Sequence, residues 1–513
     1  MSQVFVEPAF YSPRYGIQGR LDLMSASFGQ TADVQTREVE VIELKGGKPP
    51  RNPYAARESH MAQATLYQLL LDNHYPDFEG QLPRNSTRAR IFYSKSDPQN
   101  AVRFVPTDRK REARAIHTRN ALLTQRLCLS VAPSDQIVQQ IHATIAHIKP
   151  KLSGFRLKDL LEVETMLAEL DETERSYYAH WVRFLLREKH ISKLGGDRYG
   201  SRAQREIWTD TKDGRLTNLE LAATQLDEDP PTLQLRLPEG NADHNFRRGD
   251  AVMLYTELPR KGGRHMGYDA RLVPHYKGNI VKIEGGKLTV RLRHKQLNEG
   301  YFQNSQARKW ALEADVIDNS YDKQLRALGN LMRLPERKRQ RLIGISEPAK
   351  PDTYWNINTP ELTDTQRTHL SAALSSPDYY LLVGPPGTGK TGIYLKYLVH
   401  NLFAHTGQNI LLGAFTNRAV DEICEKLEQL NIDYLRVGSR NGTAEQYQSR
   451  LIDRAAEACS SRAEVQAMLQ GTRVVVGTLA SLITKPELFA LKQFDTAIVD
   501  EASQALEPQL LPV

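Results

Sequence analysis

The spacing of apolar residues changes along the chain, and each change marks a different kind of predicted structure. In the first 105 residues, short apolar or alternating runs predict β-strands, and apolar residues at helical spacing over 58–72 predict a helix. The predicted strands are residues 19–24, 38–44 and 88–93. Because the helix lies between the second and third strands, this region is predicted to be α/β.

From about residue 106 to 195 the pattern is helical and often basic, and over 196–240 it is polar, with glycine and proline. The polar stretch predicts a linker with short strands. Short alternating runs then return, with a hairpin turn at Gly285 and Gly286. These runs are residues 250–257, 278–284 and 287–293. They predict a small β-barrel.

Beyond the barrel, helical spacing over 321–342 predicts a long helix that ends in the basic run 337–341. From residue 360 onward, apolar strands alternate with helices, which predicts a doubly wound parallel sheet. A chain of 513 residues is too long for one hydrophobic core, so an α/β multidomain protein is expected. The expected parts are an α/β domain at 1–105, a helical connector at 106–240, a β-barrel at 241–318, a stalk helix at 319–350 and a sheet domain at 351–513.

Composition narrows the classes of protein only slightly. The net charge of +7 is mildly basic, which is compatible with a nucleic-acid partner but is weak evidence for one. No apolar run is long enough to cross a bilayer, and the N-terminus does not resemble a signal peptide. Cys128, Cys424 and Cys459 are too scattered for a disulfide framework, so a reducing compartment is expected, either the cytoplasm or a nucleus.

The most specific signal is a phosphate-binding loop of the form G-x-x-x-x-G-K-S/T. Its residues are Gly384, Pro385, Pro386, Gly387, Thr388, Gly389, Lys390 and Thr391. An apolar strand is predicted before the loop at 379–383, and a helix is predicted to begin near Thr391. The glycines allow backbone N–H groups to wrap the phosphates of ATP. Lys390 is expected to reach the β and γ phosphates, and Thr391 is expected to hold Mg²⁺.

Two adjacent acids complete this predicted nucleotide site. Asp500 ends a second apolar strand, where a carboxylate can steer Mg²⁺, and Glu501 is placed to orient or deprotonate the attacking water. Without the loop, this pair would be interpreted as a solvated strand end. Gln366, farther upstream, could read the edge of adenine through one donor and one acceptor bond, although alone it is an ordinary residue of a helix N-terminus.

A third group of residues predicts a metal-dependent hydrolytic site near the N-terminus. Asp22 closes one predicted strand, and Glu43 and Lys45 close another, on one face of that strand. Two acids at adjacent strand ends can share Mg²⁺ or Mn²⁺, and a lysine can position or polarise the water that attacks a phosphodiester. By itself this pattern is weak, and a solvated strand face is the alternative interpretation.

The nucleotide-site residues belong to a larger set of motifs. Four segments resemble motifs I, Ia, Ic and II of superfamily-one helicases, in the branch that contains the nonsense-mediated-decay helicase and the Okazaki-flap nuclease–helicase. These segments are residues 384–391, 414–421, 476–479 and 500–504. The resemblance implies a RecA-like P-loop domain, a β-barrel inserted between stalk helices, and 5′-to-3′ movement on single strands. It also implies that Thr416, Asn417 and Thr478 touch the strand backbone, whereas ordinary loop capping is the alternative.

The N-terminal residues resemble the PD-(D/E)XK nuclease of the Okazaki-flap nuclease–helicase family. The matching segments are residues 12–22, 41–47 and 60–67. The resemblance implies that Asp22, Glu43 and Lys45 form the metal-binding and catalytic group. It also implies that Gln63 and Tyr67, one helical turn apart, border the metal site and contact DNA.

Together these resemblances imply an ATP-dependent DNA helicase and nuclease that acts on single-stranded or flapped DNA. The implied cofactors are ATP and Mg²⁺, with Mn²⁺ as a possible ion at the nuclease site. The family usually binds an iron–sulfur cluster through four cysteines around its nuclease. Only Cys128 lies near this nuclease in the sequence, so no iron–sulfur cluster is expected.

Two alternatives stay open. One is a nucleic-acid-binding fragment that holds ATP weakly without translocating, because translocation needs a second RecA-like domain with arginines for the γ-phosphate, and none follows Val513. The other is an RNA helicase of the same branch, which the nuclease motifs argue against. In each case the barrel and the basic run 337–341 are expected to bind the nucleic-acid backbone, unless that run is only a solvated helix face.

Overall fold

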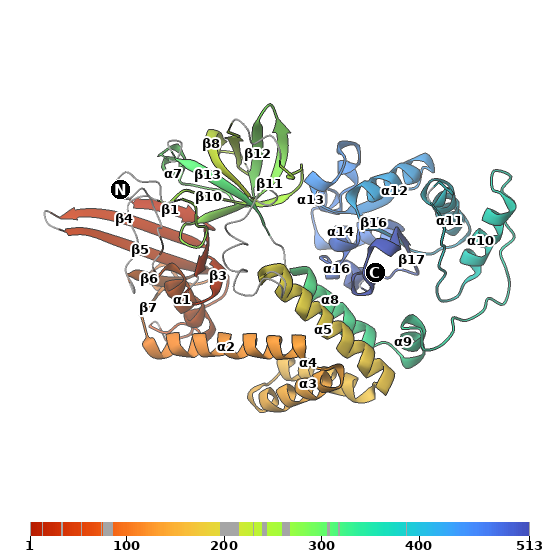
Figure 1. The fold of residues 1–513 in the computed structure, drawn as a ribbon, viewed down its shortest axis with the longest axis horizontal. Coiled ribbons are helices and arrows are strands. Elements are labelled where there is room, and N and C mark those ends of the chain that lie inside the picture. The colour runs from red at the N-terminus through yellow and green to blue at the C-terminus, as the bar shows by residue number, and fades with distance from the viewer. Residues whose placement is uncertain are drawn as a thin grey trace. The chain divides into compact units, whose positions relative to one another are not determined.

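The chain, described by a computed structural model, forms two compact units (Figure 1). The first unit combines Met1–Arg126 with His190–Val316, and the second combines Leu127–Lys189 with Ile317–Val513. The residues that the structure describes are 2–12, 14–31, 34–52, 54–72, 74, 86–194, 215–228, 230–238, 244–258, 267–304, 308–315, 319–385 and 387–511. Within these ranges, no helix combines the length and the apolarity needed to cross a membrane.

The first unit contains a five-stranded sheet, coloured red to orange in Figure 1, with the strand order β1-β4-β5-β6-β7. Its strands are β1 (Ser2–Val6), β4 (Leu23–Thr31), β5 (Val34–Lys45), β6 (Thr87–Tyr93) and β7 (Val102–Val105). Only β5 and β6 pair in parallel. Because a parallel pair requires a crossover, the chain passes through helix α1 (Glu58–Leu71), which buries Leu69, Leu70 and Leu71. The predicted α/β character of this region is confirmed.

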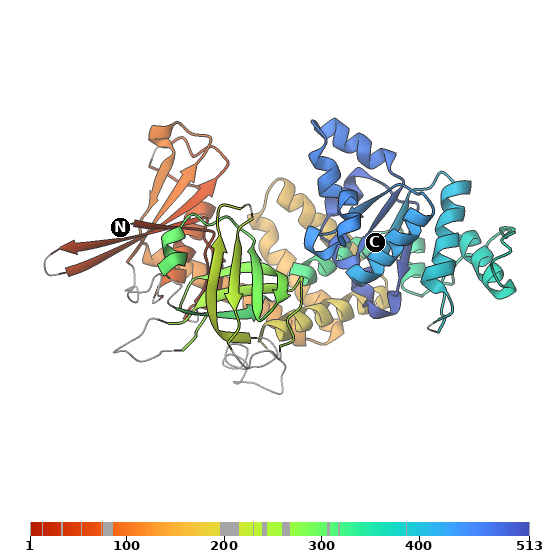
Figure 2. The same ribbon diagram turned by 90° about the horizontal axis from the view of Figure 1, so that it is seen from above.

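The same unit contains a closed β-barrel, drawn in green in Figure 2, with the strand order β10-β13-β8-β9-β12-β11. It closes because β11 also pairs with β10. Its elements are β8 (Arg215–Gln225), β9 (Thr232–Arg236), β10 (Ala251–Thr256), β11 (His275–Glu284), β12 (Lys287–Leu292), α7 (Glu299–Asn304) and β13 (Lys309–Ala314). The small barrel is confirmed, but its predicted start at 241 is too late. Strands β8 and β9 lie earlier and place Leu219, Leu233 and Leu235 in the core, each at 0% exposure.

A bend at Leu21 and Asp22 joins the barrel to the five-stranded sheet. The segment before the bend is a hairpin of β2 (Ala9–Ser12) and β3 (Ile17–Arg20). This hairpin extends the barrel sheet, since Ala9 pairs with His275, whereas the strand after the bend belongs to the other sheet. The single strand predicted at 19–24 is therefore wrong, because the chain turns in its middle and changes its pairing partners.

One hydrophobic core serves both the sheet and the barrel of the first unit. Leu21 and Met24, next to the bend, lie in the same cluster as Val41 of the sheet and as Leu233 and Trp310 of the barrel. Both layers bury their apolar faces against these shared side chains. We therefore expect the sheet and the barrel to unfold together.

His275 makes the stability of this unit sensitive to acid. Its ring is 1% exposed and stacks on the Tyr11 ring, with centroids 4.5 Å apart, where the hairpin meets the barrel. Burial is the main cause that lowers the pKa of His275 to about 3, and the charges of Lys277 and His74 act in the same direction. The folded imidazole therefore stays neutral at pH values where the imidazole of the unfolded chain takes up a proton.

We expect the free energy of unfolding to fall as the pH drops from about 6.5 to about 5, by roughly 2 kcal/mol from His275, at about 1.4 kcal/mol per pH unit. Above about pH 6.5 both states are neutral, so the contribution is complete there. Urea unfolding over this pH range measures the effect. His275→Phe should flatten the slope, and His117→Gln at an exposed position of helix α2 (Arg109–Val131) should not. An unchanged slope in His275→Phe would contradict this expectation.

A cluster of helices forms part of the second unit. The helices are α3 (Ser134–Ile148), α4 (Phe155–Glu169), α5 (Glu172–Leu194), α8 (Asn319–Met332) and α9 (Glu336–Leu342). Ile137, Leu167 and Leu328 lie in their shared core, each at 0% exposure. The single helix predicted over 321–342 is wrong, because it is interrupted before Pro335. Proline has no N–H to donate to a continuing helix, and here it caps the start of α9.

Two arginines of the basic run 337–341 are already paired with carboxylates in the second unit. Arg339 is 4% exposed, and its Nε and Nη2 donate to the two carboxylate oxygens of Glu174 at 2.6 and 2.9 Å. Arg341 donates through Nη1 to Asp378 Oδ1 at 2.7 Å. The expectation that this run binds a nucleic-acid backbone is therefore wrong for Arg339, whose guanidinium is buried against a carboxylate.

The second unit also contains a four-stranded parallel sheet, drawn in blue in Figure 1, with the order β15-β16-β14-β17. Its strands are β14 (Ile410–Ala414), β15 (Tyr434–Val437), β16 (Val474–Thr478) and β17 (Thr496–Asp500). The accompanying helices are α10 (Asp364–Ser375), α11 (Lys396–His405), α12 (Asn417–Gln429), α13 (Ile452–Glu457), α14 (Arg462–Gly471), α15 (Leu479–Leu482), α16 (Pro486–Leu491) and α17 (Glu507–Leu510). The parallel sheet predicted from residue 360 onward is confirmed.

The strand predicted before the phosphate-binding loop, at 379–383, is wrong. The structure leaves this segment outside the sheet, with Leu381 77% exposed and Val383 94% exposed. A strand is stabilised by ladder hydrogen bonds to a neighbour, and none of the four strands pairs with these residues. The apolar composition that predicted a strand is present here without a pairing partner.

Candidate active sites

The bend that carries Asp22 is tied to the end of strand β5 by a backbone hydrogen bond. The N–H of Leu44 donates to Asp22 Oδ2 at 2.7 Å. Leu44 stands between Glu43 and Lys45, so this bond brings the carboxylate of the bend next to the two side chains predicted to act with it. The structure therefore assembles the predicted group of Asp22, Glu43 and Lys45 at one end of the sheet.

Glu43 is a buried carboxylate with one oxygen left without a partner. Its side chain is 2% exposed, and Oε1 accepts a hydrogen bond from Lys45 Nζ at 2.5 Å. Among the described residues, Glu43 Oε2 is buried and has no hydrogen-bond donor. Burial raises the pKa of Glu43 and the nearby Asp22 charge raises it further, whereas Lys45 and a hydrogen bond from the Tyr67 hydroxyl lower it. An unsatisfied buried carboxylate oxygen is costly unless a proton or a cation occupies it.

Helix α1 supports this group through a chain of hydrogen bonds. Lys45 Nζ also donates to Gln63 Oε1 at 2.9 Å, and Gln63 Nε2 donates to the Tyr67 hydroxyl at 2.8 Å. Tyr67 is 8% exposed, and burial raises the pKa of its hydroxyl. Gln63 and Tyr67 thus lie beside the group of Asp22, Glu43 and Lys45. Their observed contacts orient the lysine, while the predicted contact with DNA stays a prediction.

His60 is a neighbour of the site that the sequence interpretation did not single out. Its Nδ1 lies 2.9 Å from the Tyr93 hydroxyl, and Tyr93 pairs with Lys45 across strands β5 and β6. Burial lowers the pKa of His60, and the Lys45 and Arg57 charges lower it further. Its spacing one turn before Gln63 on α1 was the signal available in the sequence.

The donor set suits a hard divalent cation that keeps water or phosphate oxygens as its other ligands. Among the described residues, no cluster of three or more histidine, cysteine, aspartate or glutamate side chains is placed to hold a metal. Asp22 and Glu43 supply two carboxylates, and Mg²⁺ commonly takes only one or two carboxylates plus water and substrate oxygens. The free oxygen of Glu43 is an available ligand, so the residues present fit such a cation.

The phosphate-binding loop lies against the end of strand β17, as the sequence predicts. Thr391 Oγ1 donates to Asp500 Oδ2 at 2.7 Å, although 109 residues separate the two. Lys390 Nζ folds back onto the loop and donates to the carbonyl oxygens of Gly384 at 2.5 Å and Pro385 at 3.1 Å. A hydroxyl and a carboxylate in contact are the pair that a nucleotide-bound Mg²⁺ requires, so these residues fit the cation and its nucleotide.

The backbone of the loop depends on its glycines. Gly387 and Gly389 have φ values of +83° and +79°, a backbone conformation that residues with a Cβ rarely adopt. Thr388 Oγ1 closes the turn by donating to the carbonyl oxygen of Pro385 at 2.8 Å. Pro386, also predicted to bind the nucleotide, lies outside the described residues. The chain then enters a helical turn at Lys390–Leu395, near the predicted helix start.

Glu501 is exposed and holds an uncommon backbone conformation. Its φ of +55° lies in the left-handed region, which costs a residue with a Cβ roughly 1–2 kcal/mol. Its N–H donates to Asp500 Oδ1 at 3.0 Å, and its carboxylate accepts from Gln504 Nε2 at 3.1 Å. A strained acid beside the loop agrees with the predicted role of orienting water, because such strain is found at functional positions.

Gln366 caps a helix in this structure. Its Oε1 accepts from the N–H of Thr363 at 3.0 Å, and its own N–H donates to Thr363 Oγ1 at 3.2 Å. Together these bonds form a capping box at the start of α10. The acceptor that adenine recognition would use is therefore engaged, and the proposed contact with adenine stays a prediction.

The three residues predicted to touch a nucleic-acid strand lie at one edge of the parallel sheet. Thr416 and Thr478 cap α12 and α15, accepting from Ala419 N and Ser481 N at 3.1 Å each. Asn417 follows Thr416 and is exposed. The strands that precede them end in register with β17, so these caps lie at the same carboxyl edge as Asp500. Capping is the observed contact of the two threonines, and strand binding by all three residues stays a prediction.

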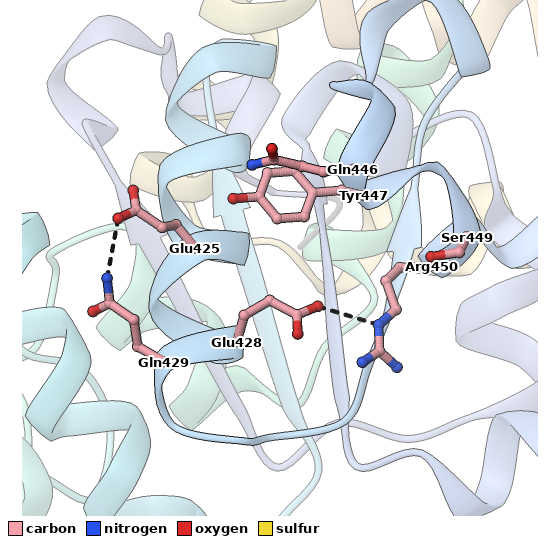
Figure 3. A pocket seen from close by; sticks show the side chains of 7 residues that line it. All are labelled: Glu425, Glu428, Gln429, Gln446, Tyr447, Ser449 and Arg450. Atoms are coloured by element: carbon pink, nitrogen blue, oxygen red, sulfur yellow. Dashed lines mark hydrogen bonds and ion pairs between the residues drawn. The ribbon is translucent and has the colours of Figure 1, made fainter.

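A cavity of about 600 Å³ in the second unit is not part of the nucleotide site (Figure 3). It is lined by Glu425, Glu428, Gln429, Gln446, Tyr447, Ser449 and Arg450. Its charged groups are already paired, since Arg450 Nε donates to Glu428 Oε1 at 3.3 Å and Gln429 Nε2 donates to Glu425 Oε1 at 3.0 Å. None of the lining residues belongs to the phosphate-binding loop or to the acids after β17.

Comparison with known proteins yields one family model and a set of relatives. The model of an AAA domain matches residues 361–466 and 443–512. The chain is 24% identical over 555 residues to the DNA replication ATP-dependent helicase/nuclease DNA2 of Bos taurus and 25% identical over 545 residues to that of Mus musculus. It is 23% identical over 550 residues to the DNA replication ATP-dependent helicase/nuclease JHS1 of Arabidopsis thaliana.

These relatives align with nearly the whole chain but not with the whole of themselves. The alignments cover 99%, 99% and 98% of this chain and 48%, 48% and 40% of the three relatives. The chain therefore spans about half the length, or less, of the curated relatives it matches. Among solved structures, a flavohemoglobin from Malassezia yamatoensis covers 73% of the chain at 10% identity with a TM-score of 0.19, which is too low to indicate a shared fold.

Proposed function

We propose that this chain, which is related along nearly its whole length to the DNA replication ATP-dependent helicase/nucleases, cleaves DNA at the Asp22, Glu43 and Lys45 group. The observation that carries the proposal is the buried, unpartnered Oε2 of Glu43 beside a second carboxylate and a lysine. A solvated strand face would not bury this oxygen. A phosphodiester substrate and its cation would complete the group.

In the proposed cleavage, Asp22 and Glu43 would hold a divalent cation through their carboxylate oxygens. Such a cation polarises the phosphate and lowers the pKa of a bound water. Lys45 keeps its ammonium at the site through its bonds to Glu43 and Gln63, where it positions the attacking water and offsets negative charge in the transition state. Tyr67 in turn orients the Gln63 amide.

We also propose that the P-loop binds ATP. Lys390 would exchange its two loop carbonyl partners for phosphate oxygens, and Thr391 and Asp500 would share the nucleotide's Mg²⁺. Glu501 would then orient the water that attacks the γ-phosphate. The proposed parts are cleavage within 1–105, nucleotide binding within 351–513, and the connector, barrel and stalk between them. The proposed substrate is single-stranded or flapped DNA, and RNA is the alternative.

The experiment that tests the cleavage proposal uses the purified chain with labelled single-stranded DNA and matched RNA. We expect cleavage of DNA in Mg²⁺ or Mn²⁺, none after chelation, and none by Asp22→Ala, which removes one carboxylate from the site. Asp159→Ala, at an exposed position of α4 in the second unit, serves as the control variant. Cleavage by Asp22→Ala at the wild-type rate would exclude this site, and cleavage of RNA alone would exclude DNA as the substrate.

A further inference from the structure

The first unit contains a second cavity that neither proposed activity uses. Its volume is about 740 Å³. It is lined by Lys48, Pro49, Pro50, Arg51, Lys95, Ser96, Asp97, Asn100 and Arg103. Four of these side chains are cationic and one is anionic, so the cavity carries an excess of positive charge. We call it the basic pocket.

The basic pocket lies at the same end of the sheet as the cleavage site. Its lining comes from the segments after β5 and β6 and from Arg103 on β7. Strands β5 and β6 run in parallel, with Lys45 opposite Tyr93. Ser94, just after β6, donates its N–H to the Lys45 carbonyl oxygen at 2.9 Å. Lys48 follows Lys45 by three residues, a span of at most about 10 Å. The pocket and the proposed metal ligands are therefore close neighbours.

The cations of the pocket lack anionic partners. The side chains of Lys48, Arg51 and Lys95 form no hydrogen bond or ion pair with any described residue. Arg103 is only 4% exposed, yet its guanidinium donates to carbonyl oxygens alone: Ala55 at 3.2 Å, Asn100 at 2.5 Å and Val102 at 3.2 Å. A nearly buried guanidinium without a counter-ion is costly, and a bound anion would offset that cost.

The residues in and beside the pocket suit a phosphate on a single strand. Pro49 and Pro50 fix the backbone between Lys48 and Arg51, which reduces the entropy lost when these side chains bind a ligand. Tyr54, three residues beyond Arg51, is 92% exposed and offers a flat face on which a base can stack. Cations beside an exposed aromatic ring are the combination that single-strand-binding surfaces use.

We propose that the basic pocket binds a phosphate group of single-stranded DNA, within about two nucleotides of the phosphate that is cleaved, because only three residues separate the two sites. This inference rests on the proposed cleavage function. The pocket would hold the strand in register with the metal site, while Tyr54 stacks on an adjacent base. It would therefore set the position of the cut along the strand.

The first experiment measures binding of single-stranded DNA to the full chain in EDTA, where no cleavage occurs, at a series of salt concentrations. The double variant Lys48→Ala/Arg51→Ala should bind roughly tenfold more weakly. Its slope of log affinity against log salt should fall by about 0.7, the value for one lost phosphate contact on a single strand. Lys158→Ala, at an exposed lysine of α4 in the second unit, is the matched control and should change neither value.

The second experiment identifies which phosphate is bound. Neutral methylphosphonate replaces one phosphate at a time along the oligonucleotide, and 5′-phosphorylated and 5′-hydroxyl oligonucleotides are compared. An internal phosphate predicts a loss of roughly tenfold at one position for the wild-type chain and no loss there for the double variant. A terminal phosphate predicts instead that the 5′-phosphate strengthens binding to the wild-type chain only. Either result supports the phosphate pocket and distinguishes the source.

The proposal is overturned if the double variant keeps the wild-type affinity, salt slope and methylphosphonate profile. That outcome leaves the cleavage proposal standing, because the loss of cleavage in Asp22→Ala tests it separately. If Asp22→Ala cleaves normally while the double variant loses the single-position effect, the cleavage proposal fails and the pocket remains. Circular dichroism and thermal unfolding should show that the substitutions at the exposed Lys48 and Arg51 leave the fold intact.

Discussion

Replacing Lys45 with alanine is expected to lower metal-dependent DNA cleavage by about a thousandfold. The ammonium contacts Glu43 Oε1 at 2.5 Å and Gln63 Oε1 at 2.9 Å, so it is both the counter-ion of a buried carboxylate and the cation of the proposed site. Without it, burial and the Asp22 charge would raise the pKa of Glu43 further, with the hydrogen bond from the Tyr67 hydroxyl left to oppose them. A protonated carboxyl group is a poor metal ligand, so more Mg²⁺ should also be needed for half-maximal rate.

Single-turnover cleavage over a range of Mg²⁺ and Mn²⁺ concentrations measures both effects. Glu40→Gln is the matched control, because Glu40 lies on the same strand but on the opposite face, where it pairs with Arg90. This variant should cleave at nearly the wild-type rate, and thermal unfolding should show both variants folded. A Lys45→Ala variant within about threefold of the wild-type rate would remove the lysine from the proposed mechanism.

Replacing Arg339 with methionine is expected to lower the free energy of unfolding of the second unit by about 3–5 kcal/mol. Arg339 donates two hydrogen bonds to Glu174, and the side chains are 5% and 1% exposed. The substitution leaves Glu174 buried without its cation, and its remaining partner is the N–H of Asp171 at 3.0 Å. The cost comes from the uncompensated charge rather than from the loss of an attractive pair.

If the uncompensated charge of Glu174 causes the loss of stability, removing that charge should reverse much of it. The double variant Arg339→Met/Glu174→Leu should recover much of the lost stability, because two apolar side chains leave no buried charge behind. Arg454→Met is the control, since its ion pair with Glu457 is exposed and should contribute less than about 1 kcal/mol. Denaturant unfolding measures all three variants. A double variant as unstable as Arg339→Met would show that packing, not charge, accounts for the loss.

The parts of the candidate sites that follow from local chemistry could be predicted from the sequence. The contact of Thr391 with Asp500 was implied by a phosphate-binding loop and an acid that ends an apolar strand, because parallel strands end at one edge of a sheet. Lys45 and Gln63 were placed together by the resemblance of residues 41–47 and 60–67 to a nuclease family, while periodicity put Gln63 and Tyr67 on one helix face. In both cases each motif has a known local geometry, so the one further assumption is that the two motifs lie side by side in the fold.

The parts that failed depend on partners far along the chain. Residues 19–24 alternate like one strand, but the pairing of Ala9 with His275 draws the preceding hairpin into the barrel. Arg339 belongs to a run that resembles a solvated basic face, and only Glu174, 165 residues away, makes it a buried residue. Residues 379–383 have the composition of a strand but no strand beside them. Local periodicity cannot report such partners.

The basic pocket was missed for a related reason. Lys48 and Arg51 lie in the loop after β5, Lys95 lies after β6 and Arg103 lies on β7, so no short window of sequence contains the group. Only the parallel pairing of β5 and β6 brings the two loops to one edge. The signal in the sequence is the presence of lysines and arginines in the loops that follow two strands predicted to pair in parallel.

The bend at Asp22 determines which part of the chain must be moved to transfer the proposed cleavage site to another protein. The Asp22 carboxylate lies where the chain leaves the barrel sheet and enters the five-stranded sheet, and the two layers share one core. An excised N-terminal segment, such as residues 1–126 grafted onto another protein, would keep every side chain of the site but lose the strand that anchors the hairpin before the bend. A protein engineered to carry the proposed cleavage site should therefore include the β-barrel as well as residues 1–126.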